Sequence, residues 1–380
     1  MTTEKGLEDV VAAQTAISDI DGTLGKLWYA GYSIEDLAER STFEEVTFLL
    51  HHGRLPTGPE LEDLTEQMVE FRETADFVTG LMPTLAEQTS PMSMLRTTVS
   101  AASAYDPDGW DQSPEANHRK AIRLTSVMPT LISSYDRHRR GLDVVPPNPK
   151  LPHAANFLYM LSGEEPDQQA ARAFDVCFIL YADHTMNAST FCARVVASTL
   201  ADMHSAVVAA IAALKGPLHG GANEQAMRML EEIGEVDRAE GFVRDLLARH
   251  QRVMGFGHRV YKTWDPRAII MRELAREQGE TAGDTRWFEI SERIQKVIEE
   301  AKGLYPNVDL YAASLLHDLG LPTDLFTPMF AAARAVGWTA HIREQYADNR
   351  LIRPDSEYIG PRDQVWTPIE ERTGSGEEAG

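Results

Sequence analysis

The pattern of apolar residues after position 167 is the feature that most constrains the fold of this chain. Apolar side chains recur there at helical spacing, and Gly, Pro or Asp separate one helical segment from the next. Runs with a period of two are few, so the helix content should exceed that of an average protein. The sequence therefore predicts a mainly α fold, with helices over 167–214 (broken near 184–189), 222–250, 266–278, 284–301, 309–318 and 325–347.

The first third of the chain predicts a small strand region followed by more helices. Residues 17–32 combine Gly, Asp and aromatic side chains, which is typical of short strands joined by turns. Ser33 and Thr42 each stand three residues before an acidic side chain, the spacing of a capping box. Helices should therefore begin after both residues, the second one ending near His52, and a further helix is expected over 59–75.

The chain is strongly acidic. Its 36 Lys and Arg against 58 Asp and Glu give a formal net charge of −22. Such a surface repels nucleic acids and anionic membranes, so neither is expected as a partner. It also repels itself at low ionic strength, and salt screens that repulsion. We therefore expect a protein adapted to a cytoplasm of high salt, as in extreme halophiles, with an acidic mesophilic protein as the alternative.

The sequence also predicts where the protein is located, the state of its two cysteines and the lack of a metal site. The first residues include neither a basic region nor an apolar core, so a cytoplasmic location is expected. Cys177 and Cys192 stand in apolar helical patterns and are interpreted as buried thiols. The sequence has no His-Glu-x-x-His pattern and no cysteine cluster, which argues against a metal site.

The apolar segment 191–214 has the length of a membrane span. Arg194, Asp202 and His204 interrupt it, however, and a charged side chain is costly in a bilayer. A helix that is apolar on most faces of a globular protein is buried, often against another subunit. We interpret the segment as a long buried helix.

A glycine-rich turn, Lys215-Gly-Pro-Leu-His219-Gly-Gly-Ala-Asn-Glu224, follows this segment and precedes the next helical pattern. Gly220 and Gly221 are expected to adopt positive φ and to let the backbone approach a ligand closely. The NH groups that begin the next helix favour a neutral imidazole beside them. His219 could then polarise a carbonyl without carrying charge. The alternative is that His219 only caps a helix.

The loop Gly255-Phe-Gly-His258-Arg-Val-Tyr-Lys262 begins like a dinucleotide-binding fingerprint, but Val260 stands where the third glycine belongs. What remains is a histidine between glycines, followed by two cations. His258 could hold a carbonyl, and Arg259 and Lys262 could hold phosphates. An exposed basic turn is the alternative interpretation.

Three further side chains are candidates for a site. Asp309 follows a proline turn near a helix start, where an aspartate is commonly an N-cap. His184 lies at the predicted helix break, a position that a core histidine also occupies. Arg334 stands in the apolar run 330–338, so it needs an anionic partner, which is either a structural carboxylate or a ligand.

Taken together, these stretches resemble the citrate synthase family. The motifs around His219 and His258, the latter continuing to Asp-Pro-Arg267, and Asn-Val-Asp309 occur in the family's order and approximate spacing. The likeness extends from Asp21-Gly-Thr-Leu to Asn-Arg-Leu-Ile-Arg353-Pro and so covers nearly the whole chain. The short length looks like the compact dimeric type of archaea and Gram-positive bacteria.

The resemblance implies a reaction and the residues that perform it. Acetyl-CoA would condense with oxaloacetate, and citryl-CoA would then be hydrolysed, with no cofactor beyond the substrates. By resemblance, Asp309 removes a methyl proton, His219 hydrogen-bonds the thioester oxygen, and His258 donates to the oxaloacetate carbonyl.

The resemblance also implies two sets of binding residues. The substrate carboxylates would be held by His184, Arg267, Arg334 and Arg353, and Arg353 would reach in from the partner subunit of a homodimer. The phosphates of CoA would meet the loop residues Gly257, Arg259 and Lys262.

A two-domain organisation follows from the same resemblance. A large helical domain would comprise 1–221 and 326–380, a smaller mobile helical domain would comprise 222–325, and segment 191–214 would help to form the dimer interface. Two alternatives remain open at this point. One is a 2-methylcitrate synthase, which uses propionyl-CoA, and the other is a non-catalytic CoA-binding regulatory protein on the same fold.

Overall fold

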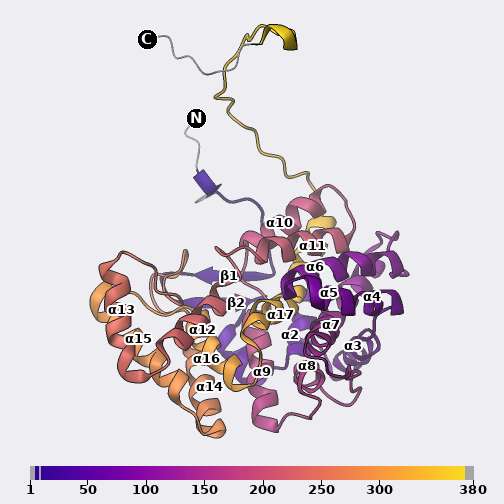
Figure 1. The fold of residues 1–380 in the computed structure, drawn as a ribbon. Coiled ribbons are helices and arrows are strands. Elements are labelled where there is room, and N and C mark those ends of the chain that lie inside the picture. The colour runs from indigo at the N-terminus through magenta and orange to yellow at the C-terminus, as the bar shows by residue number, and fades with distance from the viewer. Residues whose placement is uncertain (1–4, 8–9, 373–380) are drawn as a thin grey trace, which may run out of the picture.

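The computed structural model of the chain describes residues 5–7 and 10–372 and is mainly α-helical (Figure 1). The predicted fold class is confirmed. The α-helices are α1 (Ile34–Arg40), α2 (Phe43–His52), α3 (Gly58–Glu70), α4 (Asp76–Gly80), α5 (Met82–Gln88), α6 (Pro91–Ala102), α7 (Pro114–Arg139), α8 (His153–Ser162), α9 (Gln168–Tyr181), α10 (Ala188–Ser198), α11 (Met203–Leu214), α12 (Ala222–Ile233), α13 (Val236–Ala248), α14 (Pro266–Ala282), α15 (Arg286–Lys302), α16 (Val308–Asp318) and α17 (Phe326–Ala347). Short 3-10 turns lie at η1 (Lys5–Leu7), η2 (Ser103–Tyr105), η3 (Thr323–Leu325) and η4 (Ile369–Glu371).

A three-stranded antiparallel sheet precedes the helices, where the strand region was predicted. Its strands are β1 (Ser18–Asp21), β2 (Lys26–Tyr29) and β3 (Tyr32–Ser33), paired in that order. Ser18 lies opposite Tyr29 in the register. The Tyr29 hydroxyl donates to the backbone carbonyl of Asp183 at 2.8 Å, so the sheet is attached directly to the turn after α9.

The predicted helix starts at Ser33 and Thr42 are confirmed. The Ser33 hydroxyl accepts a hydrogen bond from Asp36 N at the start of α1. Thr42 and Glu45 form a reciprocal capping box, and α2 ends at His52. These local signals are reliable because each satisfies backbone NH groups that the helix itself leaves unpaired.

Segment 191–214 is not one long helix, so that prediction is wrong. Helix α10 ends at Ser198 and α11 begins at Met203, and the two helices pack against each other. Leu200 adopts a left-handed φ of 64° in the connection. Asp202 then caps α11 by accepting from Ser205 N at 2.9 Å. Asp202, one of the three polar residues that interrupt the apolar run, is therefore a helix cap.

Two other predicted helices differ in extent. The segment 222–250 divides into α12 and α13 at Gly234, whose φ of 69° cannot continue a right-handed helix. The helix expected over 59–75 ends at Glu70. The buried Arg72 side chain donates to the carbonyls of Asn148 at 2.7 Å and Leu151 at 2.8 Å, contacts that hold the chain outside the helix.

Helix α17 forms the centre of the molecule. Every residue from Phe326 to Ile342 is buried, and the helix packs against α2, α7, α9, α10 and α11. Figure 1 shows α12 to α16 gathered on one side of this centre. Within that group α14 packs on α16 and α13 packs on α15. The domain boundaries at 222 and 325, and any domain movement, stay predictions.

Among the described residues, no helix is long and apolar enough to cross a membrane.

His153 predicts how stability depends on pH. Its ring is fully buried, stacks on Phe43 at 5.2 Å, and has no hydrogen-bond partner for either nitrogen among the described residues. Burial lowers the pKa of His153 to about 3. The unfolded chain takes up this proton near pH 6.5 and the folded chain does not, so stability falls as the pH falls below 6.5.

We expect His153→Phe to remove this loss. At pH 5 the variant should gain about 2 kcal/mol relative to the wild type, beyond any difference between them at pH 7.5. Urea unfolding of both proteins at the two pH values measures the effect. An identical pH dependence in the two proteins would contradict it.

Candidate active site

One cavity of about 890 Å³ brings together most of the predicted site residues. It is lined by all three predicted catalytic side chains, His219, His258 and Asp309. Its wall also contains these predicted binding residues: His184, Arg267, Arg334, Gly257 and Arg259. These side chains come from α14, α16, α17 and three separate connections, so the fold joins residues that are far apart in the sequence.

His219 lies in the turn between α11 and α12, as predicted. The expected positive φ of the two glycines is wrong: Gly221 has a φ of −75°, and Gly220 is not in the left-handed region. Gly220 is instead required by close packing. A Cβ there would lie 2.5 Å from Leu214 Cγ and 2.6 Å from the Leu214 carbonyl oxygen, so any side chain would displace the turn.

The contacts of His219 determine which ring nitrogen carries the proton. Its Nε2 accepts from Ser189 N at 3.3 Å and lies 2.8 Å from Ser189 Oγ. Trp338 Nε1 donates to that same Oγ at 3.1 Å. Burial, followed by the Arg334 charge, lowers the pKa of His219 to about 4. At neutral pH the ring is therefore neutral with its proton on Nδ1, which makes Nδ1 a hydrogen-bond donor.

His258 has the opposite tautomer. Its Nδ1 accepts from two backbone NH groups, Val260 N at 3.0 Å and Tyr261 N at 3.1 Å. Burial, followed by the Arg267 charge, lowers the pKa of His258 to about 4. The neutral ring must then carry its proton on Nε2. The cavity thus contains two neutral imidazole donors whose orientation is fixed by the backbone and by Ser189.

Asp309 lies in the first turn of α16. Asn307, the N-cap of that helix, accepts from Asp309 N at 3.0 Å, and the Tyr181 hydroxyl donates to Asp309 Oδ1 at 3.3 Å. Burial raises the pKa of Asp309 to about 6, against the opposing charge of Arg267. The carboxylate is therefore ionised at neutral pH yet more basic than an ordinary aspartate, as a general base requires.

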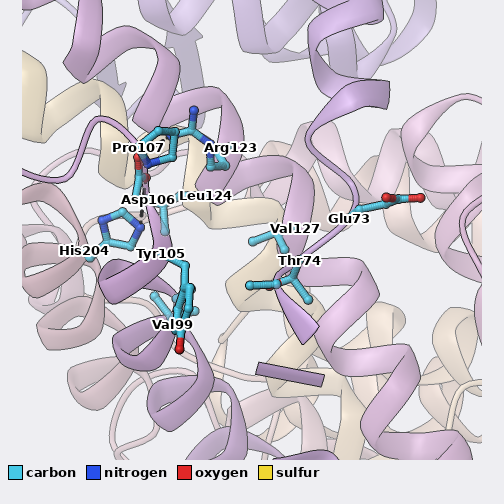
Figure 2. Close-up of a pocket in the computed structure, with 12 residues that line it drawn as sticks. Glu73, Thr74, Val99, Tyr105, Asp106, Pro107, Arg123, Leu124, Val127 and His204 are labelled. Carbon is cyan, nitrogen blue, oxygen red and sulfur yellow. Dashed lines mark hydrogen bonds and ion pairs between the residues drawn. The ribbon is translucent and has the colours of Figure 1, made fainter. Parts of the chain in front are cut away.

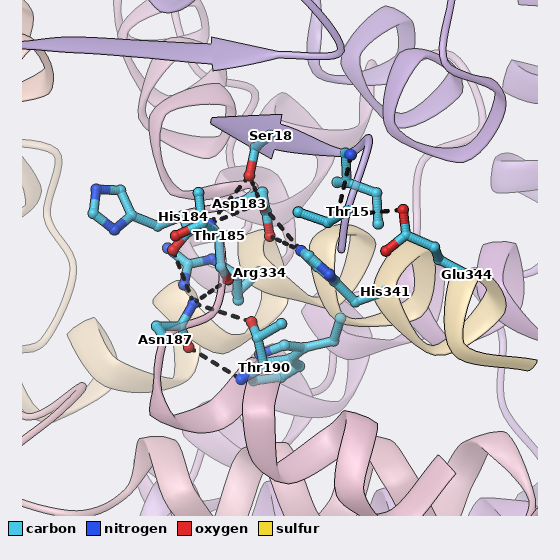
Figure 3. A network of polar contacts seen from close by, with 12 residues as sticks. Thr15, Ser18, Asp183, His184, Thr185, Asn187, Thr190, Arg334, His341 and Glu344 are labelled. Atoms are coloured by element: carbon cyan, nitrogen blue, oxygen red, sulfur yellow. Dashed lines mark hydrogen bonds and ion pairs between the residues drawn. The ribbon is translucent and has the colours of Figure 1, made fainter. Parts of the chain in front are cut away.

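His184 follows a buried carboxylate, Asp183, that organises the turn between α9 and α10 (Figure 3). The Ser18 hydroxyl and Thr185 N both donate to Asp183 Oδ2, and His341 Nε2 lies 3.3 Å from Oδ1. His184 itself is buried, and its Nε2 has no hydrogen-bond partner among the described residues. An unpaired buried nitrogen beside a cavity is suited to a ligand.

Arg334 is buried on α17. Its Nε donates to the Tyr181 carbonyl at 2.6 Å, and its guanidinium lies 4.7 Å from the centre of the Phe330 ring. Burial lowers the pKa of Arg334 to about 10, and the Asp183 charge opposes this shift. The side chain is thus cationic at neutral pH and pairs with no carboxylate of the described residues, which leaves it available for an anionic ligand.

Arg267 begins α14 and is buried against Asp265. Its Nε and Nη2 donate to the two carboxylate oxygens of Asp265 at 3.0 and 2.7 Å. Among the described residues, these are the only hydrogen bonds that its guanidinium makes, so Nη1 is left for a ligand. Asp265 raises the pKa of Arg267 despite its burial. The cavity therefore contains two fixed cations with nearby neutral histidines.

Two predicted site residues do not line the cavity in the single chain. Lys262 is exposed, and its backbone NH donates to the Gly22 carbonyl at 2.8 Å. Arg353 is 75% exposed, pairs with Asp355 at 3.2 Å, and belongs to the segment that extends away from the helical body in Figure 1. The Lys262 contact attaches its loop to the turn after β1, and Arg353 lies beyond the end of α17.

Sequence reasoning missed three residues that support the site: Tyr181, Asp183 and Ser189. Asp183 directly precedes His184 in the sequence, but an aspartate beside a candidate histidine gives no sign that its own carboxylate is buried and paired. A serine and a tyrosine at ordinary helical positions give no signal, because their partners are brought to them by α16, α17 and the turn at His219.

A second cavity of about 210 Å³ lies between α6, α7 and α11 (Figure 2). Arg123 in its wall contacts Asp106, also in the wall, at 2.6 Å and the neighbouring Asp108 at 3.2 Å. His204 Nε2 lies 3.3 Å from the same Asp106. This cavity contains none of the predicted site residues. Among the described residues, no group of three or more His, Cys, Asp or Glu is placed to hold a metal ion.

Comparison with known proteins defines the family. The model described as citrate synthase, C-terminal domain, matches residues 6–355. Citrate synthase from Haloferax volcanii is 50% identical over 97% of this chain and 99% of its own length. A 2-methylcitrate synthase from Mycobacterium tuberculosis is 42% identical over 95% of this chain and 92% of its own.

Solved structures agree with these matches. Citrate synthase from Pyrobaculum aerophilum has a TM-score of 0.91 and 45% identity, covering 97% of this chain and 95% of its own. A ternary complex of the Thermoplasma acidophilum enzyme with carboxymethyl coenzyme A and oxaloacetate has a TM-score of 0.91 and 34% identity, covering 97% and 99%. The fold and site define a condensing acyltransferase. The chain belongs to the citrate synthase family.

Gly337 provides a test of how the site is built. A Cβ at this position of α17 would lie 2.3 Å from the Ala182 carbonyl oxygen and 2.5 Å from Asp183 Oδ1. We expect Gly337→Ala to displace the turn that carries His184, lowering the melting temperature by several degrees and kcat/KM at least tenfold. Thermal unfolding and steady-state assays measure both effects.

Gly241→Ala is the matched control. Gly241 lies inside α13, and a Cβ there meets nothing within 4 Å. Alanine in a helix interior stabilises by up to about 1 kcal/mol relative to glycine, so this variant should be as stable as the wild type or more stable. A Gly337→Ala protein that behaves like the control would contradict the packing argument.

Proposed function

We propose that this cavity condenses acetyl-CoA with oxaloacetate and hydrolyses the resulting citryl-CoA. The observation that carries the proposal is the convergence of an ionised carboxylate, Asp309, with two neutral histidine donors of opposite tautomer, His219 and His258. Two buried arginines in the same wall suit a dianionic substrate.

The first step removes a proton from carbon. A thioester methyl group is a very weak acid, so the base needs an electrophile at the carbonyl oxygen at the same moment. Asp309 takes the methyl proton while the C–H electron pair moves toward the thioester carbonyl. His219 Nδ1–H hydrogen-bonds that oxygen and stabilises the enolate. Contributions of about 10² to 10⁴ from the base and about 10² to 10³ from the donor are typical.

The second step forms the carbon–carbon bond. The nucleophilic carbon attacks the ketone carbon of oxaloacetate, and the ketone oxygen takes a proton from His258 Nε2. His184, Arg267 and Arg334 hold the substrate carboxylates, and bidentate pairing with a guanidinium fixes geometry as well as charge. The proton held by Asp309 then replaces the one lost from His258. Water attacks the thioester of citryl-CoA, the C–S bond breaks with the CoA sulfur taking a proton from water, and citrate and CoA are released.

We further propose that binding of oxaloacetate moves the small domain, 222–325, toward the large one. Asp309 on α16 and His258 before α14 belong to the predicted small domain, whereas Arg334 on α17 belongs to the large domain. Closure around the first substrate would complete the acetyl-CoA site and exclude water until condensation is finished. Arg259 and Gly257, in the cavity wall, are the proposed contacts of CoA, with Lys262 reached only through loop movement.

We also propose that the active form is a homodimer. Arg353 is exposed in an extended segment, and apolar side chains along that segment are exposed too, including Ile359 at 93% and Trp366 at 77%. A partner subunit would cover these side chains and receive Arg353 in its own cavity. The α10 and α11 pair is the proposed remainder of the interface. A cytoplasm of high salt remains the proposed setting for the net charge of −22.

Activity with two acyl donors tests the proposed substrate. We expect kcat/KM with acetyl-CoA to exceed that with propionyl-CoA at saturating oxaloacetate, most strongly in multimolar KCl, where the acidic surface is screened. One methyl group is worth about 1 to 3 kcal/mol of discrimination, so the ratio should lie between about 10 and 200. A preference for propionyl-CoA would indicate a 2-methylcitrate synthase, and inactivity with both at every salt concentration a binding protein.

Asp309→Asn tests the assignment of the base. The amide keeps the shape of the side chain and cannot accept the methyl proton, so kcat should fall about 10² to 10⁴-fold. Oxaloacetate binding, measured by calorimetry, should change little. The wild-type enzyme should also lose activity below pH 6, because the pKa of Asp309 is raised to about 6 and protonation removes the base. Normal turnover in the variant would refute the assignment.

Mixed dimers test the origin of Arg353. We expect Arg353→Ala and Asp309→Asn each to be nearly inactive alone. If Arg353 serves the other subunit, co-refolding the two variants produces heterodimers in which one cavity has both residues, and up to half of the activity per heterodimer returns. No recovery in verified heterodimers would place Arg353 in the cavity of its own chain.

A further inference from the structure

The environment of Tyr181 suggests a role that the catalytic assignment leaves unexplained. Tyr181 is the last residue of α9 and is fully buried. It is not part of the cavity wall, so it lies behind the reacting groups. Its hydroxyl donates to Asp309 Oδ1 at 3.3 Å, and its backbone carbonyl accepts from Arg334 Nε at 2.6 Å.

The hydroxyl is the only hydrogen-bond donor to the Asp309 carboxylate among the described residues. Asn307 Oδ1 accepts from the backbone NH of Asp309 at 3.0 Å, which fixes the backbone of Asp309 but does not hold its carboxylate. An anchored Oδ1 leaves Oδ2 as the oxygen that meets a substrate proton. The Tyr181 ring is itself held edge-on by Phe330, with centroids 4.5 Å apart, so the donor is rigid.

We propose that Tyr181 is a positioning residue for the base, which orients the Asp309 carboxylate and sets the pH at which it becomes active. The inference rests on the proposed function, in which Asp309 removes the methyl proton. A phenol that donates to a carboxylate stabilises the ionised form. The phenol therefore keeps the Asp309 carboxylate ionised at a lower pH, and it makes that carboxylate somewhat less basic.

Several groups act on the same carboxylate. Burial opposes its ionised form most strongly, and Asp265 opposes it too, whereas Arg267 and Arg334 favour it. Tyr181 stays protonated, because burial and the Asp309 charge both raise its pKa. Arg267 is already paired with Asp265, and Arg334 is directed to the Tyr181 carbonyl. The phenol is therefore the group whose removal changes the base with least effect on substrate binding.

Tyr181→Phe tests the proposal, since it removes the hydroxyl and keeps the ring and the backbone carbonyl. We expect the acidic limb of the kcat/KM profile with acetyl-CoA to move upward by roughly 0.5 to 1 pH unit, the effect of losing one hydrogen bond to a carboxylate. The plateau kcat should fall about threefold to tenfold, and KM for oxaloacetate should stay unchanged.

Tyr346→Phe is the matched control. The Tyr346 hydroxyl donates to the Ala201 carbonyl at 2.6 Å, and this residue does not line the cavity. The control should lose stability without any shift of the pH profile. A Tyr181→Phe enzyme with a wild-type profile and kcat would overturn the proposal. If the wild-type enzyme itself lacked condensing activity, the proposed function would fail instead.

If the Tyr181→Phe protein does not fold, a second experiment tests the same proposal. Incorporation of 3-fluorotyrosine at position 181 keeps the hydroxyl and makes it a stronger donor. The acidic limb should then move downward relative to the wild type. A limb that stays in place would overturn the proposal, because a stronger donor must stabilise the ionised base further.

Discussion

The contacts of the buried Asp183 carboxylate are the interaction on which the arrangement of the site depends. It receives hydrogen bonds from Ser18 of β1 and from Thr185 in its own turn, and it lies 3.3 Å from His341 of α17. Burial acts to raise the pKa of Asp183, but His341 and then Arg334 hold it below its usual value. One ionised side chain thus joins the sheet, the turn that carries His184, and the central helix, and its loss would leave buried polar partners unsatisfied.

Burial also sets the protonation states of the side chains in the cavity. The same burial that lowers the pKa of His219 and His258 to about 4 raises that of Asp309 to about 6. At neutral pH the site therefore has neutral donors beside an ionised base. Arg334 and Arg267 supply the positive charge that an anionic substrate needs, so the histidines can remain uncharged. Burial and charge act together because the arginines themselves help to keep the histidines neutral.

Local signals in the sequence predicted the helix starts at Ser33 and Thr42 and the approximate bounds of the later helices, because each depends on a short stretch of chain. Thr42 is an example, since its partner Glu45 is three residues away. Long-range contacts could not be predicted. Ser189 orients His219 only because α10 is folded back toward the turn after α11, and Gly220 is needed for packing on Leu214 rather than for positive φ. The family resemblance supplied the candidate site residues, and the structure supplied the tautomers of His219 and His258.

The protonation states of His219 and His258, the two proposed catalytic histidines, are the most direct test of this account. Nitrogen-15 NMR of histidine-labelled enzyme, with His219→Gln and His258→Gln for assignment, reports the state of each ring nitrogen. The account predicts two neutral rings at pH 7, His219 protonated on Nδ1 and His258 on Nε2, which remain neutral at pH 5.5. A charged imidazolium at pH 7, or the opposite tautomer at either position, would contradict it.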